Sequence, residues 1–106
     1  MYGTIGKMKI RAGEEENVRQ ILSQWENEEK DTIDGVVATY FMVPDNNAGE
    51  IIGVAVFRDK EAYVANGNSP EQHERFMKLR VLLEGDPEWT DGEYLTLWVL
   101  TNVKCR

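Results

Sequence analysis

Four stretches of the chain have the apolar alternation, or the β-branched and aromatic composition, that is typical of β-strands. In residues 2–11 the apolar side chains, such as Met8 and Ile10, fall at even positions. Residues 36–43 and 51–57 are joined by a short polar loop that contains Pro and Gly, which predicts an antiparallel hairpin. The fourth stretch, residues 94–100, follows an Asp-Gly turn signal and is apolar on both of its faces.

Helical spacing appears between the first two of these strands. After Gly13, three glutamates occupy the positions where the positive end of a helix dipole favours carboxylates. The apolar residues that follow are spaced i, i+3, i+4, i+7, as in a helix with one buried stripe: Val18, Ile21, Leu22 and Trp25. This pattern predicts an amphipathic helix of about four turns.

A second helical region follows the third strand and is broken in two. Asp59 begins the first piece and Gly67 ends it. Ser69 as N-cap, Pro70 at the first helical position and Gln72 three residues after the cap form a capping box that begins the second piece. A Gly-Asp-Pro sequence ends it.

This order of elements predicts one α+β domain that spans residues 1–106. It is the β-α-β-β-α-β order of ferredoxin-like folds, in which a four-stranded antiparallel sheet carries its helices on one face. The other face would then be open, although three of the strands are apolar on both faces. Because monomers rarely expose so large an apolar patch, we expect a homodimer partner to cover it. The alternative is that the long loops and residues 102–106 fold over the sheet.

Charge and cysteine content exclude several classes of partner. The 106 residues carry 19 acidic and 12 basic side chains, a formal charge of -7, which repels the phosphates of nucleic acids. No run approaches the roughly 18 apolar residues of a membrane span, and Lys7, Lys9 and Arg11 interrupt any secretory leader. Cys105 is the only cysteine, which excludes an internal disulfide or a thiolate metal site. We therefore expect a cytoplasmic protein that binds neither nucleic acid nor membranes.

Four motifs spread over most of the chain occur together in one known family. They are the Gly13 turn into an acidic helix, residues 57–63, the capped residues 69–73, and residues 85–88. In these motifs the chain resembles the antibiotic biosynthesis monooxygenase-like (ABM) family. The resemblance implies a dimeric α+β barrel, in which two sheets pair and each forms a pocket with its own helices. Activities of that family include cofactor-independent oxidation of polyphenols to quinones, haem degradation and processing of small signalling molecules, and some members have no known activity.

Haem degradation fits this sequence poorly. Haem-degrading members of the family carry a pocket Trp, an iron-ligating His and an Asn, and by resemblance these positions hold Asn66, Phe76 and Gly6 here. The chain also lacks a Gly-rich phosphate loop, a GxSxG nucleophile, a metal-ligand cluster and a Rossmann fingerprint. The expected activity therefore uses no metal or organic cofactor.

Two residues are candidates for catalysis. His73 is the only histidine, and imidazole is the side chain best suited to proton transfer near neutral pH. It lies on the flank of the apolar stripe of its helix, so it can face the pocket rim or, as a solvated histidine, water. Asn66 is either a catalytic amide or, because Gly67 follows it, an ordinary helix terminator.

Aromatic side chains predict a pocket for a flat ring, with space left by Gly53 and Ala55 in the third strand. Six aromatic residues are candidate walls: Tyr40, Phe57, Tyr63, Trp89, Tyr94 and Trp98. Arg80 either holds an anionic ligand or pairs with Glu84 one turn later. The substrate-binding candidates are therefore Tyr40, Phe57, Tyr63, Arg80 and Trp98. Aromatic residues at this spacing are also typical of a core, which is the alternative.

Two functions from different classes remain open at this point. The first is a cofactor-independent monooxygenase of a small aromatic or polyphenolic compound, in which a base such as His73 helps to deprotonate the substrate. The second is a dimeric module without catalytic activity that binds a small hydrophobic ligand.

Overall fold

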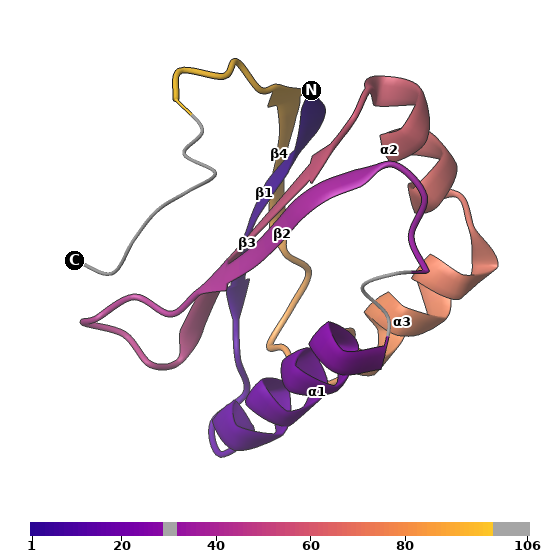
Figure 1. Cartoon of the computed structure of the whole chain (residues 1–106). Coiled ribbons are helices and arrows are strands. Elements are labelled where there is room, and N and C mark those ends of the chain that lie inside the picture. The colour runs from indigo at the N-terminus through magenta and orange to yellow at the C-terminus, as the bar shows by residue number, and fades with distance from the viewer. Residues whose placement is uncertain (29–31, 99–106) are drawn as a thin grey trace.

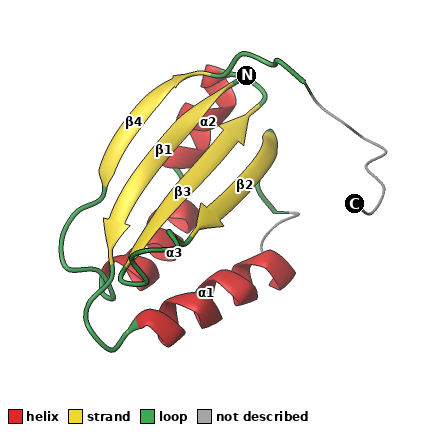
Figure 2. Ribbon diagram, turned by 90° about the vertical axis from the view of Figure 1, so that its left-hand side faces the viewer, coloured by secondary structure: helices red, strands yellow, loops and turns green. Residues whose placement is uncertain are grey.

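The computed structural model describes residues 1–28 and 32–98 of the chain. In chain order, the elements within these residues are β1 (Tyr2–Lys9), α1 (Glu15–Glu28), β2 (Val36–Met42), β3 (Glu50–Phe57), α2 (Lys60–Gly67), α3 (Pro70–Arg80) and β4 (Glu88–Glu93). All three helices lie on one side of the sheet (Figures 1 and 2). The predicted α+β, ferredoxin-like order is thus confirmed, as is the break between α2 and α3. None of the helices described is long and apolar enough to cross a membrane.

The sheet is antiparallel throughout, with the strand order β2-β3-β1-β4. Its side chains alternate between a helix-covered face and a second face that the described residues leave bare, which we call the open face. The open face consists of three cross-strand rows: Ala38, Val56, Gly3 and Gly92; Tyr40, Val54, Ile5 and Thr90; Met42, Ile52, Lys7 and Glu88.

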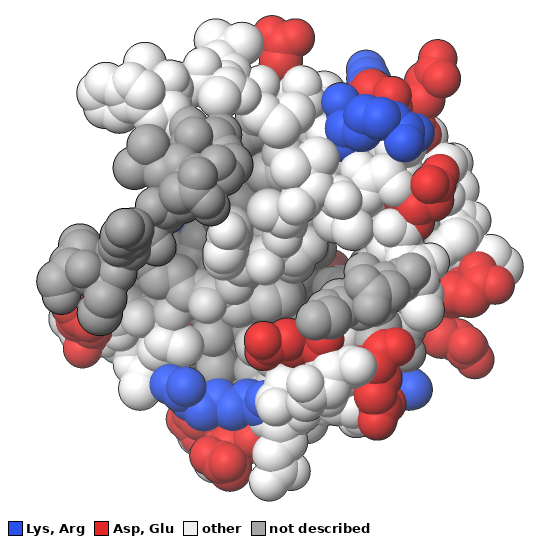
Figure 3. Space-filling model, in the orientation of Figure 1, with Lys and Arg blue, Asp and Glu red and all other residues white. Residues whose placement is uncertain are grey.

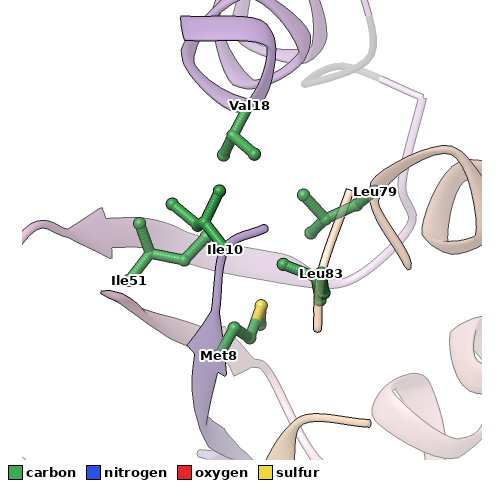
Figure 4. Close-up of a cluster of buried hydrophobic side chains, with 6 residues drawn as sticks. All are labelled: Met8, Ile10, Val18, Ile51, Leu79 and Leu83. Carbon is green, nitrogen blue, oxygen red and sulfur yellow. The ribbon is translucent and has the colours of Figure 1, made fainter. Parts of the chain in front are cut away.

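The hydrophobic core lies on the helix-covered face, toward the end of the sheet where α1 packs (Figure 4). Six buried side chains form it: Met8, Ile10, Val18, Ile51, Leu79 and Leu83. Leu83 forms an isolated β-bridge with Ile10, so the chain leaves α3 before the predicted Gly-Asp-Pro stop. Burial of a large aliphatic side chain contributes about 1.5–3 kcal/mol, which makes this cluster the main anchor of the helices on the sheet.

Side-chain caps begin α2 and α3 where the sequence predicts them. The Asp59 carboxylate accepts a hydrogen bond of 2.8 Å from the amide of Ala62, and this bond lowers the pKa of Asp59 below its ordinary value. The Ser69 hydroxyl accepts a bond of 3.1 Å from the amide of Gln72. The Gln72 side chain accepts from Arg75, one turn further along α3, so it is engaged away from the cap.

The last strand differs from the prediction. β4 ends at Glu93, so the Asp-Gly pair lies inside the strand, and residues 94–98 leave the sheet. Residues 99 and 100 of the predicted strand lie outside the described residues. Trp89 sets the actual register, because its ring packs over Gly6 of β1 and lies 6.1 Å from the ring of Phe76 on α3. Trp89 is the only apolar residue of β4, so the sequence of this strand lacks the apolar alternation by which strands are predicted.

Candidate functional site

A cleft of about 460 Å³ opens between residues 32–34, α2 and the start of α3. Its lining residues are Thr32, Ile33, Asp34, Ala62, Ala65, Asn66, Ser69, Glu71 and Arg75. The space exists because α2 presents the methyl groups of Ala62 and Ala65 here rather than longer side chains. Next to the cleft the chain turns at Gly35, whose φ of 79° suits glycine and where an added Cβ would lie 2.6 Å from the Cβ of Ala62.

Two polar side chains with ligand-binding chemistry reach this cleft from different helices. Asn66 of α2 is half-buried, and its backbone carbonyl accepts a bond of 3.0 Å from the amide of Ser69, which holds the turn between the two helices. Arg75 of α3 is also half-buried, and its guanidinium donates to the side chain of Gln72. A guanidinium carries its N–H donors in a planar fork, a geometry that suits carboxylate or phenolate oxygens.

A smaller cleft of about 150 Å³ adjoins the first between α1 and α3. Trp25, Glu74 and Lys78 line it, together with Glu71 and Arg75, which line both clefts. Arg75 therefore stands at the boundary of the two spaces. Arg75 is thus a candidate anion-binding residue, and it was not predicted from the sequence.

His73 does not reach either cleft. Its side chain is exposed, and it lies about 160–200° around α3 from Glu71 and Arg75, which line the clefts. The helix therefore points His73 away from the space where the sequence analysis expected a base. Asn66, by contrast, lines the cleft. It is not the helix terminator, because α2 continues to Gly67 and is capped by Asn68.

Phe57 and Tyr63 come together on the helix-covered face beside this cleft. The Tyr63 ring lies 5.6 Å from Phe57 and 5.4 Å from Tyr2, measured between centroids. The Tyr63 hydroxyl donates a bond of 2.9 Å to the Asp91 carboxylate of β4. Burial, together with this bond, raises the pKa of Tyr63 above the ordinary value of a tyrosine, so the phenol stays protonated and ties α2 to the sheet.

Tyr40 and Trp98 do not join these aromatic residues. Tyr40 lies on the open face and is 68% exposed, because Phe41 is the neighbour that turns toward Gly53 and the helices. Trp98 lies beyond the end of β4 and is 82% exposed. In the single chain, Tyr40 and Trp98 therefore lie apart from Phe57 and Tyr63.

Arg80 pairs with Asp86, not with Glu84. Its Nε lies 2.9 Å from the Asp86 carboxylate, and neither residue lines a cleft. Near the middle of the sheet, Trp89 and Phe76 fill the helix-covered face over Gly6, where an added Cβ would lie 2.6 Å from Cε3 of Trp89. Within residues 1–28 and 32–98, no three His, Cys, Asp or Glu side chains gather in a way that could hold a metal ion.

Comparisons with known proteins agree with this architecture. The profile of the antibiotic biosynthesis monooxygenase family matches residues 1–78. No protein among those with curated descriptions matches the sequence. Solved structures match the fold at low sequence identity. A Deinococcus radiodurans protein named after the same family has a TM-score of 0.77 at 16% identity, with 96% of this chain and 100% of that chain covered.

Two further structures show the same likeness. A protein of unknown function from Nitrosomonas europaea has a TM-score of 0.77 at 14% identity, with 95% of each chain covered. SnoaB from Streptomyces nogalater, described as a cofactor-independent oxygenase, has a TM-score of 0.74 at 13% identity, with 95% of this chain and 97% of that chain covered. At such identities these likenesses concern the fold, which different activities share.

Proposed function

The chain belongs to the antibiotic biosynthesis monooxygenase family, and on this premise we propose that it is a cofactor-independent monooxygenase of a small aromatic or polyphenolic compound. The cleft between residues 32–34, α2 and α3 is the proposed substrate site. The family assignment and the fold shared with SnoaB, itself described as a cofactor-independent oxygenase, support the reaction class.

The shape and chemistry of the cleft carry this proposal. Its volume of about 460 Å³ lies in the range of roughly 300–1,000 Å³ that small-molecule sites occupy. Ala62, Ala65 and Ile33 supply an apolar wall for a ring, while Asn66 and Arg75 supply polar groups at its edge. A phenolic compound needs this combination, because its ring is apolar and its oxygens require hydrogen-bond partners.

In the proposed reaction, Arg75 lowers the pKa of a bound phenol. A cation beside the hydroxyl favours its ionised form, so the proton leaves to solvent and the ring becomes electron-rich. For an anthrone-type ring, the carbanion form of this anion transfers electrons to dioxygen, and a C–O bond forms to give a hydroperoxide at the ring carbon. Loss of water then leaves a carbonyl, so one oxygen atom of dioxygen enters the quinone and the other leaves as water. Asn66 donates its amide N–H to a substrate oxygen and holds the ring in place.

Oxygen uptake with product analysis tests this proposal across a panel of hydroquinones and anthrones. We expect one oxygen consumed for each anthrone converted to quinone. Arg75→Gln should lower kcat/KM at least ~10-fold, because a neutral amide does not favour the anion. Arg80→Gln, which removes a guanidinium outside the cleft, is the matched control and should leave kcat/KM unchanged. If no compound of the panel is consumed above the uncatalysed rate, the oxygenase assignment fails.

A non-catalytic binding module is the second candidate, and the position of His73 favours it. The only histidine of the chain lies outside both clefts, so the site lacks the base that the sequence analysis expected. Isothermal calorimetry separates the two functions. A binding module takes up the aromatic compound with an affinity that Arg75→Gln weakens, and forms no product.

We also propose that two copies of the chain pair through the open face. Large apolar side chains there are exposed in the single chain: Ile5 is 42%, Met42 55% and Tyr40 68% exposed. Such a patch is typical of an interface, and a two-fold partner offers a complementary copy of it. Light scattering at micromolar concentration should give twice the chain mass, and a persistent monomer refutes the pairing.

A further inference from the structure

The larger cleft holds a charged side chain that the proposed reaction does not use. Three of the described residues that line it carry charge, namely Asp34, Glu71 and Arg75. The other lining residues are aliphatic or end in a hydroxyl or an amide, none of which takes up a proton at neutral pH. Among the described residues of this cleft, a base is therefore one of the two carboxylates.

Glu71 is the carboxylate that lies next to Arg75. The two residues are spaced i, i+4 on α3, a spacing that puts their Cβ atoms about 5–6 Å apart on one helical face. They are also the two residues that line both clefts. Asp34 lies on another segment, beside the Gly35 turn, and lines only the larger cleft. Glu71 and Arg75 therefore face the same part of a bound ligand.

The Glu71 carboxylate is available to accept a proton. Within residues 1–28 and 32–98, no hydrogen bond or ion pair engages it, and the Arg75 guanidinium donates to the side chain of Gln72. The Glu71 side chain is also exposed, so a proton taken from a ligand can pass on to water. A base that faces both the cleft and solvent returns to its ionised form after each turnover.

The charge of the surrounding surface makes a base inside the cleft necessary. The chain has a formal charge of -7, and acidic side chains predominate over the helices on the face shown in Figure 3. Such a field repels ligands that are already anionic. The substrate therefore enters as the neutral acid, and its proton has to be removed after it has bound.

An anthrone fits a base and a cation at neighbouring positions of one helix. Its acidic C–H group and its carbonyl oxygen lie on opposite sides of one ring, so the first can face Glu71 while the second faces Arg75. In other enzymes a carboxylate of nearly ordinary acidity removes a proton from carbon near a carbonyl, when hydrogen-bond donors stabilise the enolate oxygen.

We infer that Glu71 is the catalytic base of the proposed oxygenase and removes the C–H proton of a bound anthrone. The inference rests on the proposed function and names the group that starts the reaction. The C–H bond breaks, the proton goes to a carboxylate oxygen of Glu71, and the electron pair stays in the ring as an enolate whose oxygen lies beside Arg75. Glu71 then gives the proton to water. The enolate, which is the carbanion form described above, reacts with dioxygen.

Hydrogen exchange without oxygen tests this step alone. Anthrone is incubated with the protein in deuterium oxide under nitrogen, and mass spectrometry measures how fast deuterium replaces its methylene protons. We expect the wild-type chain to exceed the rate measured without protein. Glu71→Gln, which keeps the shape of the side chain but not its basicity, should lower the protein-catalysed rate at least ~100-fold. If this variant exchanges as fast as the wild-type chain, the inference is wrong.

Two further variants identify the carboxylate. Glu74→Gln is the matched control, because Glu74 lies on the same helix but lines only the smaller cleft, and it should leave the exchange rate unchanged. Asp34→Asn removes the other carboxylate of the larger cleft. If Asp34→Asn abolishes exchange and Glu71→Gln does not, Asp34 is the base and the inference is overturned. Circular dichroism checks that each variant is folded.

Ligand affinity separates a base from a residue that only holds the ligand. Calorimetry with methylhydroquinone should give Glu71→Gln nearly the Kd of the wild-type chain, because the amide keeps the size of the side chain and Arg75 is unchanged. A variant that loses affinity and exchange together would show that Glu71 only binds the ligand, which overturns the inference.

Failure of this inference is distinct from failure of the proposed function. A wild-type chain that exchanges anthrone protons but consumes no oxygen refutes the oxygenase and keeps the base. A wild-type chain that consumes oxygen, with a Glu71→Gln variant that exchanges normally, refutes the base alone. If the wild-type chain exchanges no faster than buffer, Glu71 is not a base for anthrones, whatever oxygen uptake shows.

Discussion

The two faces of the sheet have opposite chemistry, although the same strands build both. On the helix-covered face the side chains are buried among α1, α2 and α3, and the space that remains is a cleft with polar groups at its edge. On the open face and in residues 94–98, side chains of the same apolar kind stay exposed. This difference is the basis of two of our proposals: that the ligand binds on the helical side, and that a second subunit covers the open face.

The largest effect should come from one pair of leucine truncations. Leu83 is fully buried in the core, and Leu97, beyond the end of β4, is 79% exposed. Leu83→Ala should lower the free energy of unfolding by about 2–5 kcal/mol. Leu97→Ala should change it by less than ~0.5 kcal/mol in dilute protein, where no partner contributes. Urea denaturation measures both, and equal losses would contradict the assignment of the two faces.

A glycine pair should give the next largest difference. Gly6→Ala places a methyl group against the Trp89 ring, and such overpacking costs about 1–3 kcal/mol. Gly92→Ala on the open face meets no atom within 4 Å and should be close to neutral in the monomer. Thermal unfolding followed by circular dichroism compares them. A Gly92→Ala variant as unstable as Gly6→Ala would mean that the open face is not bare.

Tyr63→Phe should have the smallest effect, and it carries a pH signature. Loss of the bond to Asp91 should cost about 1 kcal/mol at neutral pH. Because the folded chain raises the pKa of Tyr63 above 10.0, the folded state keeps a proton that the unfolded state loses, and stability falls as pH rises above the unfolded pKa. The decline above about pH 9, where the unfolded phenol begins to ionise, should be shallower in Tyr63→Phe, although Tyr94, whose pKa burial also raises, keeps part of it. An unchanged slope would show that the phenol is not desolvated as described.

Local signals were sufficient to predict most of the fold. The Ser69 cap and the break before it were correct because a hydroxyl and a Pro at set positions act within a few residues. The Gln72 side chain does not complete the predicted capping box, since it accepts from Arg75. The hairpin of β2 and β3 was correct because its loop chemistry is equally local. The fourth strand was misplaced for the opposite reason. Residues 94–98 alternate like a strand, but only Tyr94 of them is bonded to the N-terminal residues, through Met1 and Thr4. β4 is fixed instead by the distant contact of Trp89 with Gly6.

The candidate site was harder to predict because it depends on tertiary placement. Strands β2 and β3 are apolar on both faces, so periodicity could not assign Tyr40 to a face, and a register shift between Val36 and Ala38 obscures the alternation further. Arg75 was missed because its partners in the cleft come from α2 and residues 32–34. A usable signal was present, however: Glu71 and Arg75 are spaced i, i+4 on a helix that follows the small residues of α2.

An amide NMR titration with a soluble hydroquinone, such as methylhydroquinone, tests most directly whether ligand binding belongs to the helical side. The account predicts concentration-dependent shifts at Ala62, Ala65 and Asn66 of α2 and at Arg75 of α3, with Tyr40 and Val54 of the open face unmoved. Shifts confined to the open face would contradict it, and would place the aromatic ligand where we have placed the second subunit.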